Sequence, residues 1–289
     1  MRADHRTDRD IGSKLSACSC LLRFHALHAP SLNANSASSA IAQSFHRETN
    51  HMPLKRIRNN FIQLGTLNGS LYLLDYALRK LSAGRAYIKR YYLVAQPVQD
   101  RPACRPSTKN PVVFLEPGSP LTSAFPRPPE VIAKRISDGA HCFVALSGEE
   151  FAGFLWLAFN AYDEDEVRCR YELADPQHCV WDYDVHVEPK YRIGRTFARL
   201  WDSANAHLSG HGISWSISRI SAFNPASLAA HGRLGIRTLF SANFLCLGPI
   251  QITIISAAPW FHVSLSSSSR PCVRLQAPKC ANERSLSRN

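Results

Sequence analysis

Long apolar runs and paired cysteine motifs are both missing from this chain of 289 residues. No stretch reaches the roughly 20 apolar residues needed to cross a bilayer, because Pro259 breaks the nearest one, residues 250–265. The nine cysteines include no CxxC pair, which argues against a zinc site and against a disulfide framework. We therefore expect reduced thiols, no bound metal and a cytoplasmic location.

Acidic residues are scarcer than basic ones, at 22 against 34, which gives a net charge of +12. Residues 52–110 hold eleven basic and two acidic residues, whereas residues 111–250 hold twelve basic and fifteen acidic ones. The basic segment is suited to weak association with an anionic surface, or it is simply a solvated face. It lacks a nucleic-acid-binding motif and interleaved aromatic residues, so specific nucleic-acid binding is not expected. The oligomeric state stays open.

Composition divides the chain into four segments. Residues 1–51 are rich in Ser, Ala, Asn and His without a sustained period, which predicts a disordered extension, and Met52 is an alternative start. Residues 52–110 combine a basic helical segment, a first strand and a linker rich in polar residues and proline. We expect a main domain with C-terminal strands over 111–265, followed by a mobile tail over 266–289.

Hydrophobic periodicity predicts a series of strands followed by alternating helices and strands. The predicted helices cover residues 71–81, 130–137, 194–208 and 225–234. The predicted strands cover residues 91–96, 141–146, 151–159, 167–173, 180–187, 214–220 and 238–247, with one or two edge strands in 250–265. This order is typical of an α+β protein in which helices cover both faces of a mixed sheet.

A strand edge and a helix start lie next to each other in the sequence. The strand over 180–187 stops before Pro189, and a basic turn containing a glycine then leads into the next helix. An open strand edge can pair with the amides of an extended ligand. A helix start offers converging N–H groups and a positive dipole end to an anion. The residues that would form this anion site are Arg192, Ile193, Gly194, Arg195 and Thr196.

Two sets of residues resemble the acyl-CoA site of the GNAT acetyltransferase superfamily. The family's Val-x-Pro-x-Tyr-Arg matches Val187, Pro189, Tyr191 and Arg192, and its later Asn-x-x-Ser-x-x-x-Tyr/His-x-x-Leu-Gly matches Asn224, Ser227, His231, Leu234 and Gly235. Within the family's Arg/Gln-x-x-Gly-x-Gly/Ala loop, Arg195 and Phe197 stand at the two glycine positions. Either the loop is shifted so that Gly194 takes the tight position, or pyrophosphate binding is altered.

The resemblance implies an N-acetyltransferase that transfers acetyl from acetyl-CoA to an unidentified amine by direct attack in a ternary complex. It also implies a mostly antiparallel sheet of about seven strands, splayed at the acyl-CoA site. Val185 and Val187 would pair with the pantetheine arm, and residues 192–196 would bind the pyrophosphate. Asn224 and Ser227 would complete the cofactor site, with Asn224 bonding the pantetheine arm.

Three residues are candidates for proton transfer. Strict alternation over 180–187 places Asp182, Asp184 and His186 on one face of the strand. Asp184 is the first candidate for a base and Asp182 the second, while His231 would protonate the departing thiolate. The alternative is that the carboxylates form ion pairs with basic residues of neighbouring strands, namely Arg168, Arg170 or Arg219.

Two further functions fit the same sequence. The first is a non-catalytic acyl-CoA-binding or interaction module that kept the fold after its phosphate loop changed. The second is an acyltransferase for longer acyl chains, with Phe223, Phe240 and Phe244 lining an apolar channel. Core packing explains these three phenylalanines equally well.

Overall fold

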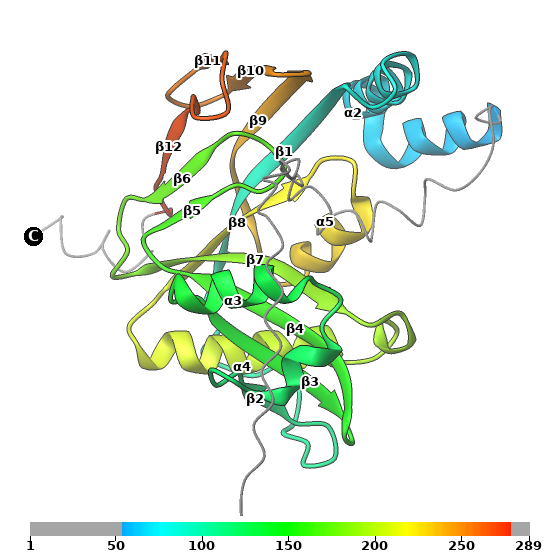
Figure 1. The fold of residues 1–289 in the computed structure, drawn as a ribbon. Coiled ribbons are helices and arrows are strands. Elements are labelled where there is room, and N and C mark those ends of the chain that lie inside the picture. The colour runs from blue at the N-terminus through cyan, green and yellow to red at the C-terminus, as the bar shows by residue number, and fades with distance from the viewer. Residues whose placement is uncertain (1–53, 279–289) are drawn as a thin grey trace, which may run out of the picture. The chain divides into compact units, whose positions relative to one another are not determined.

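The computed structural model describes residues 54–278. The predicted extension over 1–51, the alternative start at Met52 and the end of the predicted tail lie outside the described residues. The described strands form one sheet of nine strands and one of three (Figure 1).

The large sheet has the strand order β11-β10-β9-β1-β8-β7-β4-β3-β2. Its neighbouring strands pair antiparallel, except that β7 and β8 run parallel. Its strands in chain order are β1 (Ala86–Pro97), β2 (Val112–Phe114), β3 (His141–Ser147), β4 (Glu150–Ala158), β7 (Cys179–Val187), β8 (Trp215–Ser221), β9 (Arg237–Leu247), β10 (Ile250–Ile255) and β11 (Phe261–Ser264).

Helices cover both faces of this sheet. Alternate residues of β3 and β4 belong to two different core clusters, one packed against α4 (Thr196–Gly210) and the other against α3 (Pro129–Ser137). On the α4 face, α5 (Pro225–Gly232) follows β8, and α2 (Leu54–Leu81) packs against β1. Helix α2 is kinked at Gly65, where φ is +75°. Two short 3-10 turns, Pro120–Ala124 and Pro189–Tyr191, complete the helical elements.

The small sheet covers the α3 face beside α3. Its strands are β5 (Ala161–Asp163), β6 (Arg170–Leu173) and β12 (Cys272–Leu275). Strand β12 pairs parallel with β6, and Val273 and Leu275 are fully buried. The predicted mobile tail is therefore wrong for residues 272–275, because two apolar side chains at period 2 are enough to hold this strand in the core.

Strand β1 lies in the middle of the large sheet, between β8 and β9. Its residues Leu93, Val94 and Ala95 are buried to 1% exposure or less. In the sequence this strand belongs to the segment 52–110, ahead of the predicted main domain. Its pairing to strands on both sides makes it part of the same core.

The predicted fold class is confirmed: the chain has an α+β fold with a mixed, mostly antiparallel sheet and helices on both faces. The large sheet has nine strands where about seven were expected: the predicted strand over 167–173 lies in the small sheet, while residues 250–265 add two strands and 112–114 add another. Within residues 54–278 no helix is long and apolar enough to cross a membrane, and no disulfide forms.

Candidate functional site

Strands β7 and β8 separate after a short paired stretch. Their parallel pairing runs from Cys179 opposite Trp215 to Trp181 opposite Ile217. Beyond Trp181, β7 continues to Val187 paired with β4 alone among the described strands. This divergence corresponds to the splay that the resemblance implied: among the described residues, the later part of β7 has no paired strand on its β8 side.

A β-bulge interrupts β7 inside the splay. Asp184 has a φ of +49°, and the register with β4 shifts between Phe154 and Trp156. A Cβ on Gly153 would lie 2.4 Å from the backbone oxygen of His186, so the two strands approach closely where β4 carries a glycine. The bulge adds one residue to β7 and so reverses which face the following side chains occupy.

The predicted strict alternation along β7 is therefore wrong beyond Tyr183. Asp182 lies opposite Leu157, which packs on the α4 face, and Val187 packs on that same face. Asp184 and His186 lie on the α3 face instead, where the His186 ring packs against Phe154 with centroids 5.4 Å apart. The three polar residues do not form one stripe.

Asp182 directly follows Trp181, the last residue of β7 that pairs with β8, so it lies where β7 and β8 begin to diverge. It is 3% exposed, and its carboxylate accepts a hydrogen bond of 2.6 Å from the Ser216 hydroxyl. Burial raises the pKa of Asp182 to about 7, although the hydroxyls of Ser216 and Ser218 oppose the shift. A carboxyl group with this pKa can accept and release a proton near neutral pH.

Asp184 lies between two buried arginines. Its carboxylate accepts from Arg127 Nε at 2.8 Å and from Arg135 Nη1 at 2.5 Å. Burial alone would raise the pKa of Asp184, but the hydrogen bonds and charges of these arginines outweigh it and hold the pKa below its usual range. Asp184 thus forms ion pairs, as the alternative interpretation expected, but with other arginines than those expected. The actual partners come from the loop before α3 and from α3 itself.

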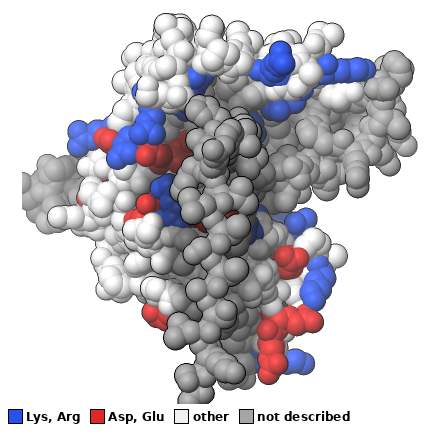
Figure 2. Space-filling model, viewed as in Figure 1, with Lys and Arg blue, Asp and Glu red and all other residues white. Residues whose placement is uncertain are grey.

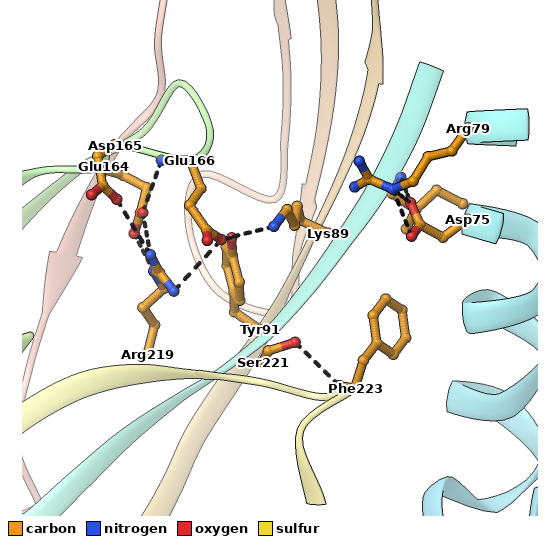
Figure 3. Close-up of polar contacts among 11 residues, drawn as sticks. Asp75, Arg79, Lys89, Tyr91, Glu164, Asp165, Glu166, Arg219, Ser221 and Phe223 are labelled. Atoms are coloured by element: carbon orange, nitrogen blue, oxygen red, sulfur yellow. Dashed lines mark hydrogen bonds and ion pairs between the residues drawn. The ribbon is translucent and has the colours of Figure 1, made fainter. Parts of the chain in front are cut away.

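The three arginines expected as partners make other contacts. Arg168 donates to backbone carbonyls, Arg170 pairs with Asp163 and Glu172, and Arg219 pairs with Glu164. Figure 3 shows Arg219 and Lys89 with the acidic turn between β5 and β6. Burial raises the pKa of Glu164 to about 7 against the effect of Arg219. The Arg219 and Lys89 charges, with the Tyr91 hydroxyl, outweigh burial and lower the pKa of Glu166 to about 2.

The start of α4 carries arginine residues that form no recorded ion pair among the described residues. Its first turn contains no acidic residue, and the N-cap Arg195 makes no side-chain cap. None of the ion pairs recorded within residues 54–278 involves Arg192, Arg195 or Arg199. Cations at a helix N-terminus oppose the dipole, so this arrangement favours an added anion.

The other predicted residues of this turn are on the surface or in the helix. Ile193 and Gly194 are exposed, and the Gly194 N–H donates to the Tyr191 carbonyl at 3.2 Å. Thr196 is 2% exposed, and its hydroxyl accepts from Arg199 at 3.2 Å. Arg192 donates from Nε to the Val187 carbonyl at 3.0 Å, so this guanidinium already occupies one acceptor of the strand edge.

Asn224 and Ser227 form the cap of α5. The Asn224 Oδ1 accepts from the Ser227 N–H at 3.0 Å, which leaves the Asn224 amide hydrogens available. Helix α5 follows the carboxyl end of β8, and α4 follows the carboxyl end of β7. Because β7 and β8 are parallel, both helix starts lie at the same edge of the sheet.

His231 joins α5 to α4 and β1. Its ring packs edge-on against Phe197 and Trp201, with centroids 5.3 and 5.9 Å away, and its Nδ1 lies 3.3 Å from Gln96 Oε1. Burial lowers the pKa of His231 to about 4, so the imidazole is neutral at pH 7. Phe197, at the family's second glycine position, therefore fills space between the two helices.

Four residues that the sequence analysis did not identify as partners contact the predicted site residues. Arg127 and Arg135 contact Asp184, Gln96 contacts His231, and Ser216 contacts Asp182. Arg135 carried a signal: it lies three residues after Ile132, on the apolar side of α3, and is 8% exposed. The phenylalanines proposed for a channel pack elsewhere, with Phe244 in the core against Tyr91 and Phe223 against Tyr72.

A surface cavity of about 290 Å³ lies beside α4. It is lined by the segment after β1, by α4 and by the turn that follows α5, and includes Trp201 and Asn205. No residue of β7 or β8 contributes to its lining, so it is separate from the splay. Among the described residues no group of three His, Cys, Asp or Glu is arranged to hold a metal ion.

Comparison with known proteins gives matches only among solved structures. No family model matches the chain, and no curated protein matches it. A functionally unknown conserved protein from Staphylococcus epidermidis is 12% identical, with a TM-score of 0.39 over 60% of this chain and 68% of that one.

Other matched structures include GNAT-family acetyltransferases. A putative acetyltransferase of this family from Novosphingobium aromaticivorans is 15% identical, with a TM-score of 0.35 over 55% of this chain and 65% of that one. A GCN5-related N-acetyltransferase from Kribbella flavida is 10% identical, with a TM-score of 0.37 over 57% and 61%. The strand order and pairing of this chain define its fold class.

Proposed function

We propose that this chain is an acyl-CoA-dependent N-acyltransferase that transfers an acetyl group to an amine. The observation that carries the proposal is the divergence of β7 from β8, with the starts of α4 and α5 at the same sheet edge. An extended thioester arm would pair with β7, and its pyrophosphate would bind at the start of α4 beside Arg195 and Arg199.

Asp182 is the better candidate for the base. The pKa of Asp182, raised to about 7 by burial, suits removal of a proton from an ammonium group near neutral pH, and the residue lies where the strands part. Asp184 is held by two arginines, and we assign it a positioning role: it anchors the bulge that shapes the open strand edge. In neutral His231 the one ring N–H lies on Nδ1, where Gln96 Oε1 accepts it, so protonation of the departing sulfur would need a proton from another donor.

A non-catalytic acyl-CoA-binding module is the second candidate. It is favoured by two contacts that narrow the site: Phe197 against His231, and Arg192 on the Val187 carbonyl. Binding through the helix start requires neither a working base nor an acid. The two candidates therefore differ in turnover and not in binding.

Calorimetric titration with acetyl-CoA tests the shared site. We expect binding by the parent chain, and an affinity at least about tenfold lower in Arg195→Ala, which loses a charge at the anion site. Asn224→Ser should also weaken binding, because serine keeps the helix cap but removes the amide donor. The matched control is Arg85→Ala, an exposed arginine ahead of β1, which should bind like the parent.

Release of free CoA thiol with a panel of amines then separates the two candidates. Thiol release that depends on the amine and is lost in Asp182→Asn supports the enzyme. Binding without thiol release supports the module. A parent chain that gives no heat with acetyl-CoA contradicts both.

A further inference from the structure

Among the described strands, β11 is the outermost strand at one edge of the large sheet. It pairs antiparallel with β10, placing Phe261 opposite Ile254 and Val263 opposite Ile252. The Ile255 N–H donates to the Trp260 carbonyl at 3.0 Å. Because bonded and non-bonded pairs alternate along an antiparallel ladder, the N–H and C=O groups of Phe261 and Val263 point away from β10, to the outer side.

This edge lacks the features that usually prevent strands from pairing with other chains. Natural edge strands carry charged side chains, prolines or bulges. Residues 238–269 contain no Lys, Arg, Asp or Glu, in a chain whose net charge is +12. Strand β11 has no proline, and its pairing with β10 runs without a register shift.

Large apolar side chains surround the same edge. Ile254 is 54% exposed, Trp260 65% and Phe261 60%. Val263 and Leu265 are also exposed. The register places Phe261 and Val263 on one face with Ile252 and Ile254. Figure 2 shows a largely uncharged area at the top of the view, where β10 and β11 lie in Figure 1. A contiguous apolar area of this kind marks an interaction surface.

We propose that β11 pairs antiparallel with β11 of a second copy of this chain, so that the two large sheets become continuous. Two identical strands related by a two-fold axis present complementary donors and acceptors to each other. Exposed Phe261 and Val263 would then meet the same residues of the second copy across the new strand pair.

Charge selects a second copy over other partners. Two chains of net charge +12 repel each other wherever their basic surfaces meet. The charge-free strip over 238–269 is therefore where two copies can approach without that repulsion. An anionic lipid surface or a nucleic acid would instead be attracted by Lys and Arg, and the strip has neither.

Sedimentation of the full chain measures this association. The monomer mass is 32.2 kDa, and we expect a species of about twice that mass at micromolar concentration. Val263→Lys places a positive charge at the proposed strand pair in both copies. Because these like charges would repel each other, the dissociation constant should rise at least about tenfold. The matched control is Ile62→Lys on α2, where Ile62 is 69% exposed, and it should leave the dimer intact.

Hydrogen exchange of the unmodified chain supplies an independent readout. The amides of Phe261 and Val263 should exchange slowly at concentrations that favour the dimer and quickly on dilution. A parent chain that stays monomeric, a Val263→Lys chain that dimerises like the parent, or exchange at these amides that does not depend on concentration would each overturn the proposal. None of these readouts involves acetyl-CoA, so the outcome is independent of the proposed function.

Discussion

At the residue scale, two aspartates two positions apart on β7 have opposite electrostatic environments. Asp182 is buried beside the hydroxyl groups of Ser216 and Ser218, and burial raises its pKa to about 7. Asp184 is also buried, but Arg127 and Arg135 hold its pKa below the usual range. Carboxyl groups whose pKa values are pushed apart take different roles, one exchanging protons and the other fixing structure.

The sequence analysis placed Asp184 ahead of Asp182 as the candidate base, whereas our proposal places Asp182 first. Residue type and spacing showed that carboxylates lie on the central strand, and they also suggested arginine partners. The actual partners, Arg127 and Arg135, come from about fifty residues earlier in the chain. Nothing local to β7 encodes that contact, because it arises from tertiary packing of α3 on the sheet.

The substitution Asp182→Asn tests the raised pKa through stability. The folded-state pKa of Asp182, about 7, is above the ordinary value of 3.8, so its contribution to stability is fully present below the unfolded pKa and is lost as pH rises through 7. Asparagine carries no charge at any of these pH values. Asp182→Asn should therefore unfold at higher temperature than the parent at pH 8, and the difference should shrink towards pH 4.

The same variant should lose roughly 100-fold or more of the amine-dependent thiol release if Asp182 is the base. In the parent, the rate should rise with pH and level off above about pH 7. Asp175→Asn, at an exposed carboxylate paired with His178, is the control and should change neither property. Full turnover by Asp182→Asn would remove Asp182 from the catalytic assignment while leaving its stability effect in place.

At the element scale, the bulge in β7 decides which predicted residues share a face. Period-2 alternation correctly predicted a strand over 180–187 but not the additional residue at Asp184, because a bulge leaves the hydrophobic pattern almost unchanged. The helices that follow β7 and β8 were predicted closely, since each begins after a proline turn or at an Asn cap. The splay could be expected only from the family resemblance.

Gly153→Ala tests the close approach of β4 and β7 next to the bulge. The new Cβ would lie 2.4 Å from the backbone oxygen of His186, so β4 and β7 must move apart. We expect a loss of about 1–3 kcal/mol in the free energy of unfolding, measured with urea. Gly232→Ala on α5, where a Cβ meets nothing within 4 Å, should be neutral or slightly stabilising. Equal stability of the two variants would contradict the close approach.

At the scale of the whole molecule, the main surprise is where β1 lies. Periodicity predicted a strand over 91–96 but could not show its neighbours, because antiparallel partners such as Ser221 and Ala242 lie more than a hundred residues away. For this reason the sequence analysis assigned residues 52–110 to a segment separate from the main domain. The pairing of β1 to β8 and β9 instead joins the start and the end of the described chain in one core.

Leu93→Ala tests this joined core, because Leu93 is fully buried in the middle of β1. Removing its side chain should cost about 2–5 kcal/mol, and the loss should lower the stability of the whole sheet and not of one segment. Urea unfolding followed by tryptophan fluorescence reports mainly on β4, β7, β8 and α4, where Trp156, Trp181, Trp215 and Trp201 lie. This transition should shift together with that of circular dichroism. Leu81→Ala, at a leucine that is 87% exposed, should leave both transitions unchanged.

If Leu93→Ala separates the two transitions, residues 52–110 fold independently of the rest of the sheet, and β1 does not have the central energetic role that its position implies.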